Sequence, residues 1–442
     1  MSSKSPTTSR RVGAVLAALA LLGAACGSSS KGTSGAGGGG GATAPGVTAT
    51  TINIGATVPL TGPAAPGYSE IAPAANAVFK WVNAHGGVNG RRIHYDYVDD
   101  GYNPSVTATK TRQLVLQDNI FADVGPLGTP TQTAVQPFLN AQKVPQLFIE
   151  SGCTCWNNPK YPESFGWQPN YLVEGKILGQ YIKDHFAGMK VGYLYQNDDF
   201  GQGFDQGLDA ELPASSVVSR QSYDSATLSG PLSNQVAALK AAGAQVVAMA
   251  TIPAATALAM LPAAAIGYSP QFVVSNVGAD PPTVAPLLAS FSKGKAGETL
   301  LNGMISDAYL PPEADTSNPW IQVSKKLLAD YDSGAPVDGN TVYGVGLGYT
   351  FVQALQKAGK DLTRTDLVSA IENDSVNFVT PGLTPLTYSR TDHYGYSGGE
   401  VVKIENGAAS SVSPIYVTAN TGPITISKVT PSVPPANLVS TA

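Results

Sequence analysis

Several short stretches of this 442-residue chain have the residue types of enzyme active sites. Residues 395–399, GYSGG, match the G-x-S-x-G spacing that presents a nucleophilic serine in hydrolases, where a later acid and histidine complete the site. Neither Asp nor His follows Ser397 in this chain. Asp99 and Asp100 could form an acid–base pair, but two aspartates before Gly101 are more typical of a turn that leads into a helix. We therefore predict that the protein is not an enzyme.

Cofactor and metal motifs are missing from the sequence as well. There is no G-x-x-x-x-G-K-[ST] phosphate loop, and residues 344–348, GVGLG, do not fit G-x-G-x-x-G. The four histidines, at positions 85, 94, 185 and 393, lack the paired spacing of metal ligands. A net charge of −5, with 13% charged residues, leaves no basic surface for nucleic acid. We expect no cofactor, no metal and no nucleic-acid partner.

Residues 129–132, TPTQ, have the composition of a helix start that could bind an anion. We expect Thr129 to be the N-cap, Pro130 to be the first helical residue and Gln132 to complete a capping box. The free N–H groups and positive dipole end of a helix N-terminus favour a carboxylate. The alternative is an ordinary helix cap without a ligand.

The N-terminal segment has the pattern of an export signal. Arg10 and Arg11 precede the uncharged residues 12–25, which are too few to cross a bilayer as a helix, since that needs about 20. The segment ends LLGAAC and resembles a bacterial lipobox with Cys26 as the lipidated residue, although Gly23 stands where Leu is usual. The alternative is an ordinary signal peptide with an incidental Cys. Residues 26–50, rich in Gly and Ser, are expected to form a flexible tether or a terminus without a function.

Two further cysteines, Cys153 and Cys155, remain once Cys26 carries lipid. An exported protein meets an oxidising compartment, in which two spare thiols can pair. One intervening residue makes the ring tight, so both a disulfide and two free thiols stay open.

Strands and helices alternate through the rest of the chain, and 43% hydrophobic residues suffice for a large core. We predict strands over residues 51–58, 92–98, 120–124, 145–149, 190–195, 244–250 and 271–275, and helices over residues 71–83, 105–117, 131–141, 202–211, 232–242 and 254–266. This alternation predicts parallel sheets covered by helices on both faces, in two α/β lobes. Ligands bind such sheets at the carboxyl ends of the strands.

Six stretches resemble, in the same order, the type I periplasmic binding proteins for branched-chain amino acids: PLTG at 59–62, NAHGGVNGR at 83–91, DDGYNP at 99–104, GPLGT at 125–129, DDFGQG at 198–203 and TVY at 341–343. The resemblance implies two doubly wound parallel-sheet lobes joined by a multi-strand hinge. It places the export signal at 1–25, the tether at 26–50, lobe one at 51–171 and 308–388, lobe two at 172–307 and 389–425, and a C-terminal tail at 426–442.

The resemblance also implies a function. We expect an extracytoplasmic, monomeric lipoprotein, anchored to the membrane of the cell envelope, that captures a small polar solute for an ABC permease. An amino acid or a related carboxylate or amide would be the solute. The alternative is a ligand-sensing lipoprotein of the same fold that reports to a signalling partner.

By the same resemblance, several positions should contact the ligand. The Thr129 hydroxyl would hold a ligand carboxylate, together with backbone N–H groups near Cys153 and Thr154. Phe200 stands where the family carries an aromatic residue against the ligand, although it could equally be a core residue. The other candidates are Thr131 beside Thr129, Tyr68 and Trp156 in loops after strands, and Thr251 and Asn276 at positions where the family has other residues.

Asn276 departs from the family pattern, since amino-acid binders carry an acid near this position to pair with the ligand ammonium. Burying an ammonium without a counter-charge is costly. Either Asp280 reaches into the site, or the ligand lacks an α-ammonium. We favour the second alternative.

Overall fold

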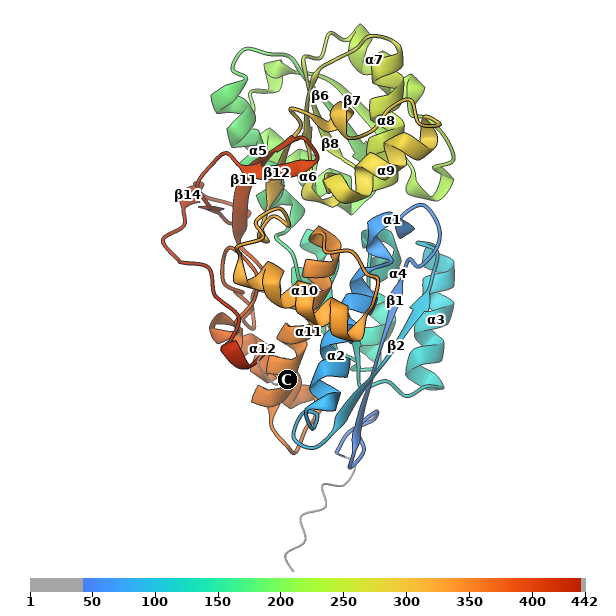
Figure 1. Cartoon of the computed structure of the whole chain (residues 1–442), viewed down its shortest axis with the longest axis vertical. Helices are drawn as coiled ribbons and strands as arrows, with labels where there is room; N and C mark the ends of the chain where they lie inside the picture. The colour runs from blue at the N-terminus through green and yellow to red at the C-terminus, as the bar shows by residue number, and fades with distance from the viewer. Residues whose placement is uncertain (1–42, 439–442) are drawn as a thin grey trace, which may run out of the picture. The chain divides into compact units, whose positions relative to one another are not determined.

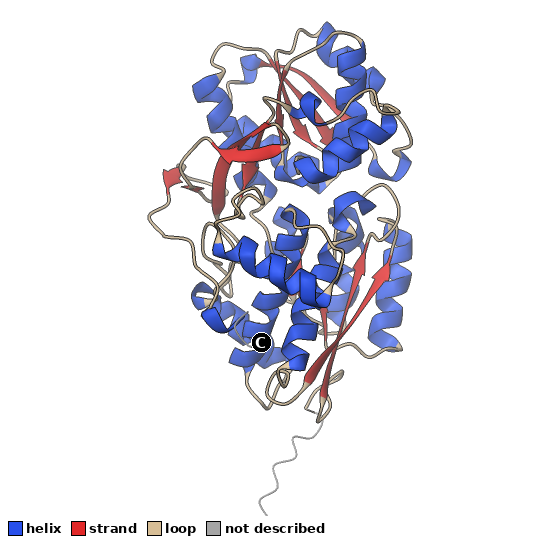
Figure 2. Ribbon diagram, in the orientation of Figure 1, coloured by secondary structure: helices blue, strands red, loops and turns tan. Residues whose placement is uncertain are grey.

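The computed structural model describes residues 43–438. The predictions for the export signal and for Cys26 lie outside the described residues. Residues 43–438 form two lobes, each with a sheet between layers of helices (Figures 1 and 2). The predicted α/β fold with parallel-sheet lobes is confirmed. No helix between residues 43 and 438 has both the length and the apolar composition needed to cross a membrane.

Lobe one is built on a five-stranded parallel sheet in the order β2-β1-β3-β4-β5. Its strands are β1 (Thr51–Val58), β2 (Arg92–Asp99), β3 (Ala122–Val124), β4 (Gln146–Ile149) and β5 (Ser164–Gly166). Its helices are α1 (Ala65–Tyr68), α2 (Ile71–Ala84), α3 (Pro104–Leu116), α4 (Thr129–Ala141), α10 (Pro319–Tyr331), α11 (Gly339–Ala358) and α12 (Arg364–Asp374). Helices α3 and α4 pack together on one face of the sheet, and α2, α10 and α11 pack on the other (Figure 1).

Lobe two has a larger, mixed sheet in the order β14-β13-β11-β10-β9-β8-β6-β7, with β12 paired to β11. The parallel part contains β6 (Val191–Gln196), β7 (Val217–Tyr223), β8 (Val246–Ala250), β9 (Gln271–Val274) and β10 (Ile305–Ala308). The antiparallel part contains β11 (Gly398–Glu405), β12 (Ala408–Ser411), β13 (Tyr416–Val417) and β14 (Thr425–Ile426). Its helices are α5 (Tyr171–His185), α6 (Asp199–Glu211), α7 (Ser233–Ala241), α8 (Pro253–Ala265) and α9 (Pro281–Phe291).

The strand sequences explain the layers. All five residues of β8, VVAMA, are buried, as expected for a central parallel strand that helices cover on both faces. Helices α5 and α6 approach each other closely because glycines lie at their contact. A Cβ atom on Gly175 would stand 2.2 Å from the carbonyl oxygen of Phe204. This close packing fixes the first turns of both helices, which carry Tyr171 and Phe200 toward the other lobe.

The predicted helix start at Thr129 is wrong in detail. Gly128, with φ of 107°, is the N-cap of α4, and Thr129 already lies inside the helix. The Gln132 side chain does not form a capping box, because its Nε2 donates to the Leu127 carbonyl and to the Thr57 hydroxyl, each at 3.1 Å. A glycine takes a positive φ without the steric cost that Thr would meet there.

The predicted segment boundaries differ from the structure in two places. The end of the predicted tether packs on lobe one, since Val47 is 2% exposed and the Asn53 N–H donates to the Gly46 carbonyl at 2.8 Å. Residues 389–396, predicted in lobe two, also pack on lobe one. The His393 ring stacks on Phe165 at 4.0 Å between centroids, and the His393 carbonyl accepts from the Gly166 N–H at 3.0 Å.

The C-terminal residues form a further connection between the lobes. β14 pairs within the lobe-two sheet, whereas Ser432 is hydrogen-bonded to both backbone groups of Thr380 in lobe one. Leu438, at the end of a short 3-10 helix (Ala436–Leu438), is 1% exposed. We call residues 427–431 the strap, because they run from β14 to lobe one (Figure 1). The chain therefore crosses between the lobes four times, near residues 167–170, 309–312 and 397 and through the strap.

Candidate ligand-binding site

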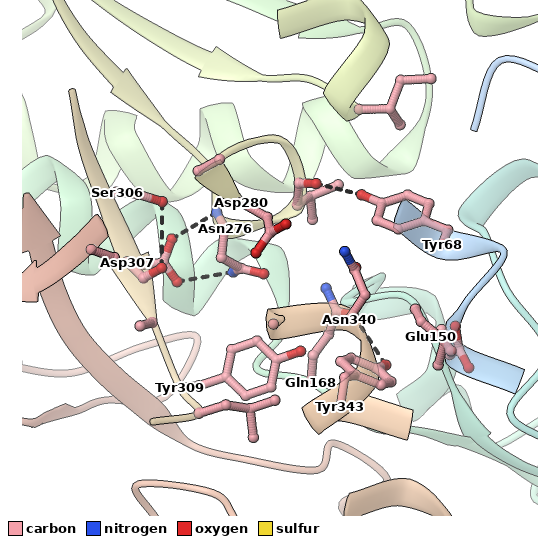
Figure 3. Close-up of a pocket in the computed structure, with 18 of the residues that line it drawn as sticks. Tyr68, Glu150, Gln168, Asn276, Asp280, Ser306, Asp307, Tyr309, Asn340 and Tyr343 are labelled. Carbon is pink, nitrogen blue, oxygen red and sulfur yellow. Dashed lines mark hydrogen bonds between the residues drawn. The ribbon is translucent and has the colours of Figure 1, made fainter. Parts of the chain in front are cut away.

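A cavity of about 160 Å³ lies between the two lobes (Figure 3). Its walls come from segments that follow strands at their carboxyl ends in both lobes, and from the residues that cross between the lobes. A cavity of about 150 Å³ holds a benzene molecule, so this one suits a ligand of about six to ten non-hydrogen atoms. The lining residues used below are Tyr68, Tyr102, Thr129, Glu150, Gln168, Tyr171, Phe200, Asn276, Asp280, Asp307, Tyr309, Glu313, Asn340 and Tyr343.

The lobes touch each other around this cavity, so the structure describes a closed form. Three of the hydrogen bonds that join them involve residues lining the cavity: Tyr68 Oη to the Val277 carbonyl (Figure 3), Gln196 Nε2 to Tyr102 Oη at 3.3 Å, and Asn340 Nδ2 to Thr283 Oγ1 at 3.1 Å. We call these three pairs the inter-lobe bonds. They can form only when the lobes are together.

Six aromatic side chains line the cavity: Tyr68, Tyr102, Tyr171, Phe200, Tyr309 and Tyr343. The Phe200 and Tyr171 rings lie 4.4 Å apart at 45°, and Phe200 is 1% exposed. Burial raises the pKa of Tyr171 to about 12, so its hydroxyl keeps its proton. The wall therefore offers aromatic faces together with hydroxyl groups.

Asn276 is anchored by two buried acids that the sequence did not predict. Its backbone N–H donates to Glu174 Oε1 at 2.9 Å and to Asp307 Oδ1 at 3.0 Å, and its Nδ2 donates to Asp307 Oδ2 at 2.9 Å (Figure 3 for Asp307). Burial, and then the charge of Asp307, raises the pKa of Glu174 well above its ordinary value. Burial also raises the pKa of Asp307, whereas its hydrogen bonds with Glu174 and Asn276 lower it. Asp307 is the member of this pair that lines the cavity.

Asp280 answers the question that the sequence left open, because it lines the cavity. It caps α9 by accepting bonds from the N–H of Thr283 at 3.0 Å and from its hydroxyl at 2.5 Å. Burial is the first cause that raises the pKa of Asp280 to about 7, and the charges of Asp338 and Glu313 add to it. The structure therefore supports the alternative in which Asp280 reaches the site. The inference that the ligand lacks an ammonium loses its basis.

Four of the predicted residues line the cavity: Tyr68, Thr129, Phe200 and Asn276. Thr129 is 2% exposed, and its Oγ1 lies 2.7 Å from Ser151 Oγ. Its hydroxyl is therefore already engaged within lobe one.

The other five predicted residues lie outside the cavity lining: Thr131, Cys153, Thr154, Trp156 and Thr251. Trp156 is a core residue whose Nε1 donates to the Ser151 carbonyl at 2.8 Å. The hydroxyls of Thr131 and Thr251 are used internally, by the Leu127 carbonyl at 2.5 Å and by Thr256 Oγ1 at 2.7 Å.

Cys153 and Thr154 belong to the loop behind the cavity wall. Cys153 is 1% exposed and is joined to Cys155 in a disulfide. Thr154 begins a short 3-10 helix (Thr154–Asn157), and its carbonyl accepts from Tyr394 Oη at 2.9 Å. These groups stabilise the loop and do not face the cavity.

Apart from Asp280, the sequence did not point to the acids of the cavity, nor to most of its tyrosines. Glu150 directly follows a predicted strand, so its position after Ile149 was a usable signal. Asp307 lies inside β10 and Tyr309 directly follows it, and the sequence did not predict this strand. Gln168 and Tyr171 lie where the chain crosses between the lobes, and no local sequence pattern marks such a crossing.

The comparisons with known proteins agree with this architecture. Residues 51–409 match the family model described as "Periplasmic binding protein". A "Leu/Ile/Val-binding protein homolog 1" of Brucella suis biovar 1 (strain 1330) is 28% identical over 320 residues, which cover 70% of this chain and 77% of the relative. An "Amino acid binding protein" of Pseudomonas aeruginosa is 26% identical over 165 residues, covering 36% of this chain and 42% of the relative.

Two solved structures share the fold. A branched-chain amino acid ABC transporter protein from Thermus thermophilus with bound valine superposes with a TM-score of 0.71 at 19% identity, over 86% of this chain and 98% of that protein. A fatty acid ABC transporter substrate-binding protein from Thermomonospora curvata gives a TM-score of 0.72 at 23% identity, over 85% and 95%. Proteins of this fold bind solutes without chemical conversion. The chain belongs to the type I periplasmic binding proteins, in the family that includes the Leu/Ile/Val-binding proteins.

Proposed function

We propose that the protein is an extracytoplasmic substrate-binding lipoprotein of an ABC importer, which encloses a small polar organic solute between its lobes. One observation supports this above the rest: a single cavity has walls from both lobes. A solute can make its full set of contacts only when the lobes are closed. Binding therefore stabilises the closed form, which would dock on a permease.

A ligand screen tests this proposal. The protein would be melted with and without amino acids, keto acids, amides, amines and ureas, and hits would be followed by small-angle X-ray scattering. One or a few solutes should raise the melting temperature, reduce the radius of gyration and be recovered unchanged. Chemical conversion of a bound solute, or the lack of any hit across all classes, would contradict the proposal.

The anchor is tested separately. The apolar segment before Cys26 and the Gly- and Ser-rich stretch after it support lipid attachment. Cys26→Ser should move the protein from the membrane fraction to the aqueous fraction without altering solute affinity. Retention of Cys26→Ser on membranes would contradict the anchor and leave solute capture untouched.

A further inference from the structure

Glu150 stands in the lobe-one wall of the cavity, directly after β4 (Figure 3). Its backbone is held on both sides, since its N–H donates to the Pro126 carbonyl at 2.9 Å and its carbonyl accepts from the Gly128 N–H at 3.2 Å. The loop that holds Glu150 is thus the loop that carries Thr129. The carboxyl group and the Thr129 hydroxyl belong to one wall.

The Glu150 carboxyl group lacks a partner of its own. The side chain is 7% exposed, and Oε2 forms no hydrogen bond within the described part of the chain. The ionisable groups near it are Tyr95, Tyr309 and Tyr343, which carry no charge at neutral pH. Buried polar groups are normally hydrogen-bonded, so an unpartnered carboxyl group in a cavity wall points to a partner in the ligand.

The local backbone is adapted to this carboxyl group. A Cβ atom on Gly125 would lie 3.3 Å from Glu150 Oε1 and 3.2 Å from the Leu347 side chain, and Gly125 has φ of +65°. Any larger residue at 125 would be strained and would crowd the carboxyl group. Gly125 therefore leaves the space that Glu150 occupies.

The cavity is lined by acidic side chains and by no basic ones. Its lining contains Glu150, Asp280, Asp307 and Glu313, and within residues 43–438 it contains no Lys, Arg or His. In Figure 3, Glu150 and Asp307 stand on opposite sides of the residues drawn. The aromatic side chains between them offer ring faces, which attract cations.

We propose that Glu150 determines specificity by binding a protonated nitrogen of the solute, so that the solute is an organic cation with no carboxylate at the lobe-one wall. This inference rests on the proposed function and restricts the class of solute to organic cations. A carboxylate beside Thr129 would lie against Glu150 and keep it protonated, and the lining offers no Lys, Arg or His side chain to pair with that carboxylate. An ammonium group would instead form a charged hydrogen bond. Small primary amines fit, including diamines and amino amides, whose second polar group would reach Asp307 or Asp280.

Binding of a cation should change the protonation of Glu150. Burial raises the pKa of Glu150 well above its ordinary value, which favours the protonated carboxyl group while no cation is bound. An ammonium ion favours the ionised carboxylate, and Glu150 would release that proton to solvent on binding. An anionic ligand would leave the proton in place or require a further one.

The experiment compares solutes of matched shape by calorimetry: leucinamide, 3-methylbutylamine, leucine and 4-methylpentanoate, with 1,4-diaminobutane as the diamine. At least one amine without a carboxylate should bind about ten-fold or more tightly than leucine, and 4-methylpentanoate should not bind. Titrations in two buffers with different heats of ionisation should show proton release. Glu150→Gln should weaken the amine by about ten-fold or more and abolish that release, whereas Glu298→Gln, at an exposed glutamate of lobe two, should change neither.

Three results would overturn the inference: leucine or 4-methylpentanoate binding more tightly than every amine, proton uptake on binding, or an unchanged amine affinity in Glu150→Gln. If Glu150→Gln does not fold, the wild-type series and its proton balance decide. A neutral or anionic solute that closes the lobes would leave the proposed function standing and remove this inference. If no solute of any class binds, both the proposed function and this inference are contradicted.

Discussion

Glu174 lies in the first turn of α5, behind Asp307, and is 1% exposed. Its Oε1 accepts the Asn276 N–H, and its carboxyl group is also hydrogen-bonded to Asp307. Because burial and Asp307 raise its pKa above the ordinary 4.5, the folded protein holds a proton that the unfolded chain releases. The free energy of unfolding should therefore fall as the pH rises upward from about 4.5.

Glu174→Gln tests this pH dependence at the scale of one residue. Gln keeps the shape and an acceptor for Asn276 but cannot ionise, so the decline in stability with pH should become shallower by up to about 1.4 kcal/mol per pH unit. Urea unfolding between pH 5 and pH 8 measures the slope. Glu405→Gln, at the exposed end of β11, is the control and should match the wild type. An equal slope in Glu174→Gln and wild type would mean that Glu174 is ionised in the folded protein.

The Cys153–Cys155 disulfide remains a prediction about the protein in solution. The structure joins the two sulfur atoms behind the cavity wall. The intact mass measured without reductant should be lower by two hydrogens than the mass measured after reduction. Equal masses would show that both thiols are free.

At the scale of elements, the inter-lobe bonds connect the start of α11 to α9. Asn340, at the start of α11, donates to Thr283 in α9 only when the lobes are closed. Asn340→Ala should remove this contribution to the closed form and raise the apparent Kd of the solute by about 2- to 10-fold. Calorimetry measures the change. Asn373→Ala, at an exposed position in α12, is the matched control; an equal loss of affinity in both variants would contradict the assignment.

The helices and strands show how much of the fold could be predicted from the sequence. Strands and helices with clear periodicity, such as β1 and α2, agree with the predictions to within a residue. β5, SFG, and β10, ISDA, were not predicted, because neither contains the continuous apolar run that marks the equally short β4, QLFI. Asp307, inside β10, and Tyr309, directly after it, were missed for this reason, because a position at the end of a strand is recognised only when the strand itself is recognised.

The residues that line the cavity were harder to predict than the helices and strands. Of the ligand contacts that the resemblance implies, Thr129 and Phe200 lie in the cavity lining, whereas Trp156 and Thr251 are buried outside it. The orientation of a side chain after a strand depends on one or two backbone dihedral angles, which composition and spacing do not reveal. Glu150 was within reach of the sequence, since it ends a predicted strand, but its lack of a partner is visible only in three dimensions.

At the scale of the whole molecule, closure brings acids of the two lobes together. Asp280 of lobe two approaches the start of α11, where a Cβ atom on Gly339 would lie 2.9 Å from its Oδ1. Lobe one contributes Glu70, Glu313 and Asp338 to the same region. Burial raises the pKa of Asp280 to about 7, and Asp338 and Glu313 add to the shift. Opening would return Asp280 to water, so the closed form binds its proton more tightly.

The ligand-free protein should therefore be more closed at pH 5 than at pH 8. Its radius of gyration by small-angle X-ray scattering should be smaller at pH 5, because the protonated Asp280 adds no repulsion across the gap. Asp280→Asn retains a helix-capping side chain and should reduce the difference between the two pH values. A wild-type radius that is the same at both pH values, or larger at pH 5, would contradict this prediction.

The strap has a consequence for the order in which the molecule can be assembled. Lobe one draws on residues near 51–166 and 312–396 and on the docked segment around Ser432 and Leu438, whereas the parallel sheet of lobe two is complete once residue 308 is available. During synthesis from the N-terminus, the second lobe can build its sheet while the first still awaits later parts. Lobe one is therefore begun first and completed last. A translation product that stops early would contain the parallel sheet of lobe two beside an incomplete lobe one.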